Sequence, residues 1–406
     1  MPVNWVKPKL VCEIKFAEWT KDRIARQPIF MGLRVDKKAK DVMFEKSVNV
    51  SMIKKASKAK VSSTKVQGTK KKTAAKKSAK PGSGAVKPVG KTSNKQVDSY
   101  EGEDQHIVLN NEELKLTNLN KIYWKKEGFT KGDMINYYLK IAPYILPYMI
   151  DRPQSLNRHP NGIDAPNFFQ KNHKGKLPRW MKTHEDFSES TNETIEYLVC
   201  GNEATLIYMA NLGCIEMNPW HSRSQSWQKP DWCLIDLDPD KPNSFDQVMD
   251  VAKLVKQVLD SIGAKGYVKT SGSSGIHIYI PLGAQYSYDQ SKQLAKLIVT
   301  LVNHEMPDLT SVERSPAKRK GKIYLDFLQN RETQTAAAPY CLRPKPGVPV
   351  STPLDWSELK KGLTPKTYNA NNIFDRLKVE GDLFKPVLGK GIDLEKVLSK
   401  LAVQIK

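Results

Sequence analysis

The chain has 406 residues and a mass of 45.9 kDa, enough for two or three domains of roughly 100–200 residues each. Hydrophobic residues make up 39% of it, and no apolar stretch approaches the roughly 20 residues of a membrane-spanning helix, which excludes an integral membrane protein. The net charge of +22 indicates a polyanionic partner such as nucleic acid, but residues 54–97 alone carry fourteen lysines and no acid, whereas residues 98–406 carry only +3.

Residues 1–53 are predicted to form a small β-rich segment. LVCEIKFAEWT and QPIFMGLRVDK alternate apolar and polar residues as strands do. They resemble the last part of the oligonucleotide-binding-fold domain of ATP-dependent DNA ligases, since FAEWT at 16–20 matches and Arg34, Asp36 and Lys37 match that family's final R-x-D-K motif. The nucleotidyl-lysine motif K-x-D-G is absent from the whole sequence, so the segment is interpreted as a remnant and no ligase activity is expected from this chain.

Residues 54–97 are predicted to be a disordered lysine-rich linker. They contain no aromatic residue and cannot bury enough apolar surface to offset the entropy of ordering. Two interpretations stay open: a solubilising spacer, or an arm that binds phosphate backbones with a salt-dependent affinity. In both cases the linker separates the first segment from a larger domain over residues 98–406.

The larger domain is predicted to be α+β, with mixed or antiparallel sheets and flanking helices. Thr130 is expected to cap a helix from Lys131 to about Met149, and two further helices are expected at Phe245–Ile262 and Asp289–His304. Alternating apolar and polar residues predict strands at Trp232–Leu237, Gly266–Thr270, Ile276–Pro281 and Lys322–Leu328.

The five cysteines and the amino terminus indicate the compartment. The cysteines are widely spaced and form no C-x-x-C pair, which favours neither a disulfide framework nor a zinc knuckle. The first residues, MPVNWVKPKL, have no apolar run behind a basic start and are not a secretory signal. We therefore expect a protein of the reducing cytoplasm.

Three aspartates in predicted strands indicate a site for divalent cations. In DWCLIDLDPD, the alternation along a strand places Asp236 and Asp238 on one face and Ile235 on the other. Two carboxylates that face one way repel each other unless a cation lies between them, and oxygen ligands suit Mg²⁺ or Mn²⁺. Asp326 in KIYLDF supplies a third carboxylate, facing away from Leu325. A lone D-x-D is more often a simple strand end, but the neighbouring motifs favour the metal site.

A Gly-Ser loop separates the two acidic strands. In KTSGSSGIHIYIPL, residues 269–282, Gly272 and Gly275 permit a tight turn whose amides can bind phosphate oxygens. His277 and Tyr279 then share a face of the next strand. Such a loop alone usually just turns the chain, but its position between the two acidic strands favours a phosphate site.

Basic residues surround the third aspartate. Lys318, Arg319 and Lys320 precede it, Gln329 follows it, and Arg343 lies in YCLRPKPG. A metal-bound triphosphate keeps excess negative charge, and arginine holds such charge by paired hydrogen bonds. Each of these lysines and arginines alone would be interpreted as a solvated surface cation, and it is their clustering that favours a nucleotide site.

Residues 106 to about 402 resemble the polymerase domain of bacterial ligase D, a non-homologous end-joining enzyme of the archaeo-eukaryotic primase superfamily. The resemblance covers nearly three quarters of the chain and rests on motifs in a fixed order: LTNLNKIYW, RHPNG with FFQK, EMNPWHSR, LIDLDPD, TSGSSGIHIYIP, and YLDFLQN with AAAPYCLRP. It implies a primase-polymerase fold and a nucleotidyltransferase that adds nucleotides, with a preference for ribonucleotides, to DNA 3′-hydroxyls at gaps and double-strand breaks.

The resemblance also implies roles for individual residues. The catalytic and metal-binding carboxylates would be Asp236, Asp238 and Asp326. The incoming nucleotide would be held by His221, Ser271, His277, Arg319, Gln329 and Arg343. The 5′-phosphate of the DNA end would be bound by Asn118, Lys121 and Lys131, and Phe169 would stack on a template base. Relatives often carry a basic residue in the S-G-x-x-G loop where this chain has Ser273 and Ser274.

The expected cofactors are two divalent cations, Mn²⁺ or Mg²⁺, one activating the attacking 3′-hydroxyl and the other stabilising the pyrophosphate leaving group. The expected substrates are NTP or dNTP and DNA ends that carry a 5′-phosphate, and the expected partners are the Ku end-binding protein and a DNA ligase. The family places the protein in the bacterial cytoplasm, associated with the nucleoid and not with a membrane.

Two other functions are compatible with the sequence. A primase would start strands without a primer, and a DNA-end-binding module would retain the fold around a degenerate acidic site. The intact aspartates argue against the second. A metal-dependent phosphoesterase is not expected, since no histidine-rich ligand set is present.

Overall fold

The computed structural model of the protein describes residues 12–15, 29–33, 104–188 and 192–404. The chain divides into two compact units, Met1–Gly90 and Lys91–Lys406, and the division falls inside the predicted linker. The linker itself and most of residues 1–53 lie outside the described residues. In the first unit, strands β1 (Cys12–Lys15) and β2 (Ile29–Leu33) pair antiparallel, as the alternating pattern predicts.

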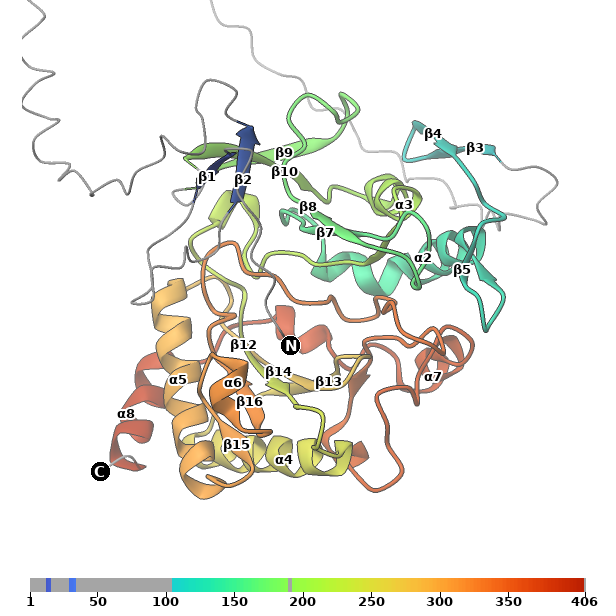
Figure 1. Ribbon diagram of the computed structural model, residues 1–406. Helices are drawn as coiled ribbons and strands as arrows, with labels where there is room; N and C mark the ends of the chain where they lie inside the picture. The colour runs from blue at the N-terminus through green and yellow to red at the C-terminus, as the bar shows by residue number, and fades with distance from the viewer. Residues whose placement is uncertain (1–11, 16–28, 34–103, 189–191, 405–406) are drawn as a thin grey trace, which may run out of the picture. The chain divides into compact units, whose positions relative to one another are not determined.

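A six-stranded sheet forms the centre of the second unit (Figure 1). Its strands, in spatial order, are β15 (Thr310–Ser311), β16 (Ile323–Asp326), β12 (Trp232–Asp238), β14 (Ile276–Pro281), β13 (Tyr267–Thr270) and β17 (Pro353–Leu354). All neighbours pair antiparallel except β15 and β16, which are parallel. The sheet is therefore mixed, and the predicted α+β class is confirmed.

The four predicted strands are confirmed with small changes at their ends. The strand expected over Lys322–Leu328 is shorter, because the backbone N–H of Leu328 donates to Asp326 Oδ1 at 2.8 Å and turns the chain out of the sheet. That turn places the carboxylate of Asp326 at the very end of its strand.

One face of the sheet packs against three helices, α4 (Phe245–Ile262), α5 (Tyr288–Glu305) and α8 (Leu394–Gln404), which Figure 1 shows grouped together. Capping boxes at Ser244 and Ser287 start α4 and α5, because each serine hydroxyl and a glutamine three residues later satisfy backbone groups that the first turn leaves free. The predicted bounds of α4 are confirmed, and those of α5 differ by one residue at each end.

The opposite face of the sheet contributes Leu234 and Tyr279 to a second core, built with α2 and α3. The elements of this part are β3 (Gln105–Leu109), β4 (Glu112–Leu116), β5 (Ile122–Trp124), β6 (Phe129–Thr130), α2 (Lys131–Ile145), η3 (Leu146–Tyr148), β7 (Leu156–Arg158), β8 (Phe168–Gln170), β9 (Lys182–Ser188), β10 (Glu193–Val199), α3 (Glu203–Asn211), β11 (Cys214–Glu216) and η4 (Ser224–Ser226).

Helix α2 starts where the sequence predicts, with Thr130 in a capping box, but it ends at Ile145 and not at Met149. Leu146 begins the next turn and Pro147 follows it; because proline has no N–H to donate to the α-helical hydrogen-bond pattern, the chain continues as the short 3₁₀ helix η3. The rest of the unit contains α6 (Pro316–Arg319), η5 (Trp356–Glu358), α7 (Ile373–Glu380) and η6 (Lys385–Leu388). The described part of the chain holds no helix with the length and hydropathy of a membrane span.

Candidate active site

Four polar side chains form a row across the face of the central sheet that is turned away from α4, α5 and α8. Asp236 on β12 lies opposite Asp326 on β16 and opposite His277 on β14. His277 in turn lies opposite Lys269 on β13. Directly opposed residues of antiparallel strands point to the same side with Cβ atoms about 4.5–5.5 Å apart. The register therefore brings together residues that are up to 90 positions apart in the sequence.

The acidic end of this row is electrostatically strained. Burial, together with the neighbouring carboxylates of Asp238 and Asp326, raises the pKa of Asp236 to about 7. Burial also raises the pKa of Asp238, although the guanidinium of Arg319 opposes that shift. The side chain of Asp236 is 22% exposed and that of Asp238 is 53% exposed, so both can be reached from solvent.

Protein groups approach the carboxylates of Asp326 and Asp238. Asp326 accepts the Leu328 N–H at 2.8 Å and Gln329 Nε2 at 3.2 Å, and Asp238 lies 3.8 Å from Arg319 Nη1. Within the described part of the chain, no group of three His, Cys, Asp or Glu side chains is arranged to hold a metal ion. The donor set still fits a divalent cation, because bound positive charge relieves the repulsion between neighbouring carboxylates.

The backbone of the Gly-Ser loop between β13 and β14 packs against the backbone at the end of β12. A Cβ on Gly275 would overlap the carbonyl oxygen of Leu237 at the end of β12, and Gly272 has a φ of +70°, in the region that favours glycine. Ser271 Oγ accepts the N–H groups of Ser273 at 3.2 Å and Gly275 at 3.0 Å. Two of the loop amides that the sequence predicts for phosphate binding are thus occupied by Ser271.

Arg343 connects the Gly-Ser loop to a buried carboxylate. Its Nε donates to Glu216 Oε2 at 3.0 Å, and its Nη1 donates to the carbonyl oxygen of Ser271. Glu216 also accepts hydrogen bonds from Asn157 Nδ2 at 3.1 Å and Asn218 Nδ2 at 3.3 Å. Burial would raise the pKa of Glu216, but Arg343 and the two amides hold it below its usual value. Glu216 is therefore a charged anchor for Arg343.

Two buried histidines present ring nitrogens that have no protein partner. His221 is 1% exposed, and neither of its ring nitrogens is hydrogen-bonded within the described residues. Burial, with the nearby Arg152, lowers the pKa of His221 to about 3. Burial and Lys269 lower the pKa of His277 well below its usual value, and His277 Nε2 lies 3.4 Å from Asp236 Oδ1. Both imidazoles are neutral near pH 7 and can donate or accept a hydrogen bond from a ligand.

Arg319 is held at the edge of the site by its surroundings. Its guanidinium donates to the carbonyl oxygens of Glu313 and Arg314, each at 2.9 Å, and stacks 3.7 Å from the ring centre of Tyr324. A cavity of about 290 Å³ borders this segment and is lined by further basic residues, Lys318, Lys320 and Lys322. The positive charge predicted near the third aspartate is therefore present beside Asp238.

The residues predicted to bind a 5′-phosphate lie together in a separate place. The N–H of Lys121 donates to the carbonyl of Asn118 at 3.1 Å, and the N–H of Lys131 donates to the carbonyl of Lys121 at 2.8 Å. Lys121 Nζ donates to Asn161 Oδ1 at 2.6 Å. Lys131 is only 3% exposed, and its Nζ donates to Asn211 Oδ1 at 2.8 Å, so its side chain packs beneath the surface on which Lys121 lies. Burial lowers the pKa of Lys131 to about 8.

Phe169 lies on β8, and its side chain is 61% exposed. The neighbouring Phe168 is 47% exposed and lies 5.2 Å from the guanidinium of Arg158. Large exposed aromatic rings beside a cation are suited to stacking on nucleic-acid bases. The geometry is compatible with the template contact predicted for Phe169.

Two family descriptions match the chain. The first, "LigD, primase-polymerase domain", matches residues 130–384, which is more than half of the chain. The chain belongs to the LigD primase-polymerase family. The second, "ATP dependent DNA ligase C terminal region", matches residues 1–37, where the sequence resembles the end of a ligase fold. Both resemblances seen in the motifs are confirmed.

LigD proteins of several bacteria are similar over much of the chain. LigD of Bacillus subtilis strain 168, a "bifunctional non-homologous end joining protein", is 33% identical over 269 residues, which cover 66% of this chain and 43% of that protein. The "multifunctional non-homologous end joining protein LigD" of Pseudomonas aeruginosa is 26% identical over 382 residues, which cover 94% of this chain and 40% of that protein. The chain thus spans less than half the length of these LigD relatives.

A solved LigD structure has the same fold. The polymerase domain from Mycobacterium tuberculosis ligase D, in complex with DNA, superposes with a TM-score of 0.63 at 27% identity. The match covers 69% of this chain and 99% of that domain. The predicted primase-polymerase fold is confirmed.

The sequence did not single out three residues that contact or adjoin the predicted site residues: Lys269 beside His277, Glu216 beside Arg343, and Asn161 beside Lys121. Lys269 is completely buried at the end of the polar row, where burial lowers its pKa to about 7. The signal for Lys269 and Glu216 was a single charged residue inside an apolar strand, in YVKT and CIE. Asn161, in the quoted motif RHPNG, had no signal beyond its place in that motif.

Proposed function

We propose that this chain catalyses template-directed addition of nucleotides to a DNA 3′-hydroxyl at gaps and double-strand breaks during non-homologous end joining. The observation that carries the proposal is the row of Asp326, Asp236 and His277 across three adjacent strands, in a chain of the LigD primase-polymerase family. The similar mycobacterial domain is described in complex with DNA, which supports DNA as the polymer.

The incoming nucleotide is placed between the neutral histidines and the arginines. The unpartnered ring nitrogens of His221 and His277 can hydrogen-bond a ligand without adding charge. Arg319 and Arg343 supply positive charge on two sides of the carboxylates, and Ser271 and Gln329 supply polar groups next to them. A triphosphate, which brings at least three negative charges, is suited to such an arrangement.

Asp236, Asp238 and Asp326 are proposed to hold two divalent cations, Mn²⁺ or Mg²⁺. Such cations, when bound, lower the pKa of the attacking 3′-hydroxyl and neutralise charge on the pyrophosphate leaving group. The protein holds the three carboxylates on one face of the sheet, and the raised pKa values of Asp236 and Asp238 favour exchange of a proton for a cation.

The DNA end is proposed to be held away from the carboxylates. Lys121 is positioned by the backbone of Asn118 and Lys131 to bind a 5′-phosphate, and Phe169 stacks on a template base. The Ku protein and a DNA ligase are the proposed partners, ribonucleotides the proposed preferred substrates, and the bacterial nucleoid the proposed place of action.

Primer extension on a gapped duplex with a 5′-phosphate tests the proposal, with ribo- and deoxynucleotides compared in Mg²⁺ and in Mn²⁺. Incorporation should be lost in Asp326→Ala and retained in the control Asp260→Ala, which removes an exposed carboxylate of α4. Incorporation that survives Asp326→Ala would refute the metal assignment.

The same assay separates the alternatives. Products formed on single strands without a primer would identify a primase. DNA-end binding without any incorporation in Mn²⁺ would identify a binding module.

A further inference from the structure

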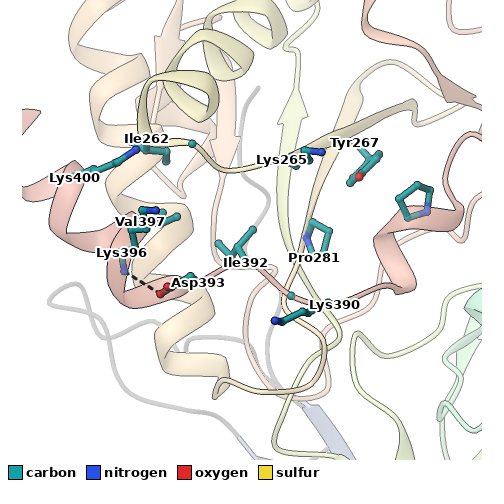
Figure 2. Close-up of a pocket in the computed structure, with 13 residues that line it drawn as sticks. Ile262, Lys265, Tyr267, Pro281, Lys390, Ile392, Asp393, Lys396, Val397 and Lys400 are labelled. Atoms are coloured by element: carbon teal, nitrogen blue, oxygen red, sulfur yellow. Dashed lines mark hydrogen bonds between the residues drawn. The ribbon is translucent and has the colours of Figure 1, made fainter.

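A second pocket lies at the end of the central sheet that is far from the Gly-Ser loop. It has a volume of about 430 Å³ and is formed by three chain segments: 262–267 at the start of β13, Pro281 at the end of β14, and 386–400 around the start of α8 (Figure 2). Pro281 is four residues along the strand from His277, or about 13 Å at the usual rise of a strand. The pocket is therefore distinct from the carboxylate site.

Positive charge surrounds this pocket. Its lining contains four lysines, Lys265, Lys390, Lys396 and Lys400, which Figure 2 shows around Ile392 and Pro281. The single acid in the lining, Asp393, accepts the backbone N–H of Lys396 at 3.1 Å at the start of α8. Asp393 therefore serves as a helix cap, and its one negative charge cannot balance four cations.

The four ammonium groups have no counter-ion within the part of the chain that the structure describes. Among the described residues, none of them forms an ion pair or donates a side-chain hydrogen bond. Some lysines of the nearby helices do have acidic partners: Lys256 pairs with Asp260 at 2.5 Å and Lys292 pairs with Asp289 at 2.6 Å. The gathering of four unpaired lysines around one pocket leaves a local excess of positive charge, which is suited to an anionic ligand.

Three ring-bearing side chains also line the pocket. They are Tyr267, Pro281 and Pro386, and the Tyr267 hydroxyl has no hydrogen-bond partner among the described residues. A planar base can stack on such a ring, a contact worth about 1–3 kcal/mol for a nucleic-acid base on an aromatic side chain. Lysine recognises phosphate as a point charge and needs no fixed geometry to do so.

We propose that this pocket binds a nucleotide, with its phosphates among Lys265, Lys390 and Lys396 and its base against Tyr267. Lys400 is left out of the phosphate contacts because its Nζ lies beside Gly263, at the carboxyl end of α4, where a cation offsets the helix dipole. The volume lies in the range of roughly 300–1,000 Å³ that small-molecule pockets occupy. A free nucleotide and a nucleotide unit of a nucleic-acid strand share this chemistry. The proposal does not depend on the polymerase activity.

Lysine acetylation, measured residue by residue by mass spectrometry on the full chain without divalent cations, tests the proposal. ATP, inorganic triphosphate and a single-stranded oligonucleotide serve as probes. Because each lysine is measured separately, binding by residues 54–97 does not obscure the result.

We expect a nucleotide probe to protect Lys265, Lys390 and Lys396 and to leave two exposed controls, Lys361 and Lys366, unchanged. Protection by ATP would identify the free nucleotide as the source, and protection by the oligonucleotide alone would identify a strand. Protection by inorganic triphosphate as strong as by ATP would overturn the role of the base, and no protection by any probe would overturn the proposal.

Charge reversal gives an independent measurement. Lys390→Glu/Lys396→Glu should weaken the binding of the protecting probe by about tenfold or more, because a hydrogen bond to a charged group is worth at least that factor. The control Lys361→Glu/Lys366→Glu changes the net charge by the same amount outside the pocket. Tyr267→Ala should weaken binding of the nucleotide but not of inorganic triphosphate. If the two charge-reversal variants weaken binding of the probe equally, the effect comes from net charge alone and the proposed binding site is refuted.

Discussion

Replacement of Glu216 by glutamine tests whether a buried carboxylate positions Arg343, which is proposed to bind the nucleotide. Glu216→Gln keeps the size of the side chain and removes its charge. In the wild type the carboxylate accepts hydrogen bonds from Arg343, Asn157 and Asn218. Arg343 in turn donates a hydrogen bond to the carbonyl oxygen of Ser271. The variant therefore leaves the guanidinium without its counter-ion.

The expected magnitude follows from the burial of the pair. Removing one partner of a buried ion pair costs about 3–5 kcal/mol. The side chains of Arg343 and Glu216 are 16% and 11% exposed, and glutamine can still accept one hydrogen bond, so we expect a loss of about 2–3 kcal/mol in the free energy of unfolding. Typical domains have about 5–15 kcal/mol, so the variant should still fold.

The functional effect is larger on nucleotide binding than on turnover. If Arg343 holds the triphosphate, loosening it removes a charged hydrogen bond, and the KM for the nucleotide should rise about tenfold. Gap-filling kinetics and urea unfolding measure the two effects separately.

A matched control exists in the same domain. Glu358 pairs with Arg376 at 2.5 Å, with side chains 23% and 10% exposed, and lies outside the polar row. Glu358→Gln should cost a similar stability and leave the nucleotide KM unchanged. If the two variants change KM equally, the effect is only one of stability and the positioning role of Glu216 is wrong.

Three further outcomes are expected. Burial lowers the pKa of Lys269 from 10.5 to about 7, so between these pH values the unfolded chain holds a proton that the folded chain lacks. The free energy of unfolding therefore rises with pH by at most about 1.4 kcal/mol per pH unit. Lys269→Met should lose this rise in urea unfolding at pH 7–10, and an equal rise in the variant and the wild type would contradict the prediction. Lys121→Ala should weaken DNA binding about tenfold only when the downstream strand carries a 5′-phosphate, and an equal loss on unphosphorylated DNA would make Lys121 a general backbone contact. Phe169→Ala should weaken templated binding by about 1–3 kcal/mol in a gap-binding titration, and an unchanged affinity would exclude the stacking role.

Local sequence was sufficient to predict features that depend on a periodic pattern or on residues close together in the chain. The bounds of α4 follow from its apolar repeat and its cap at Ser244, and the shared face of Asp236 and Asp238 follows from alternation along one strand. The end of α2 was predicted four residues late, because the apolar pattern continues through Pro147 although the hydrogen bonds do not.

The sequence by itself determined the fold class, the family motifs and the charge distribution, which places most of the +22 in residues 54–97. Only the tertiary structure decided that Asp326, Asp236, His277 and Lys269 form one row, and that Glu216 is the anchor of Arg343. The physical reason is that strand register and the pairing of buried charges are set by which distant segments pack together, and no local periodicity encodes the partner of a strand.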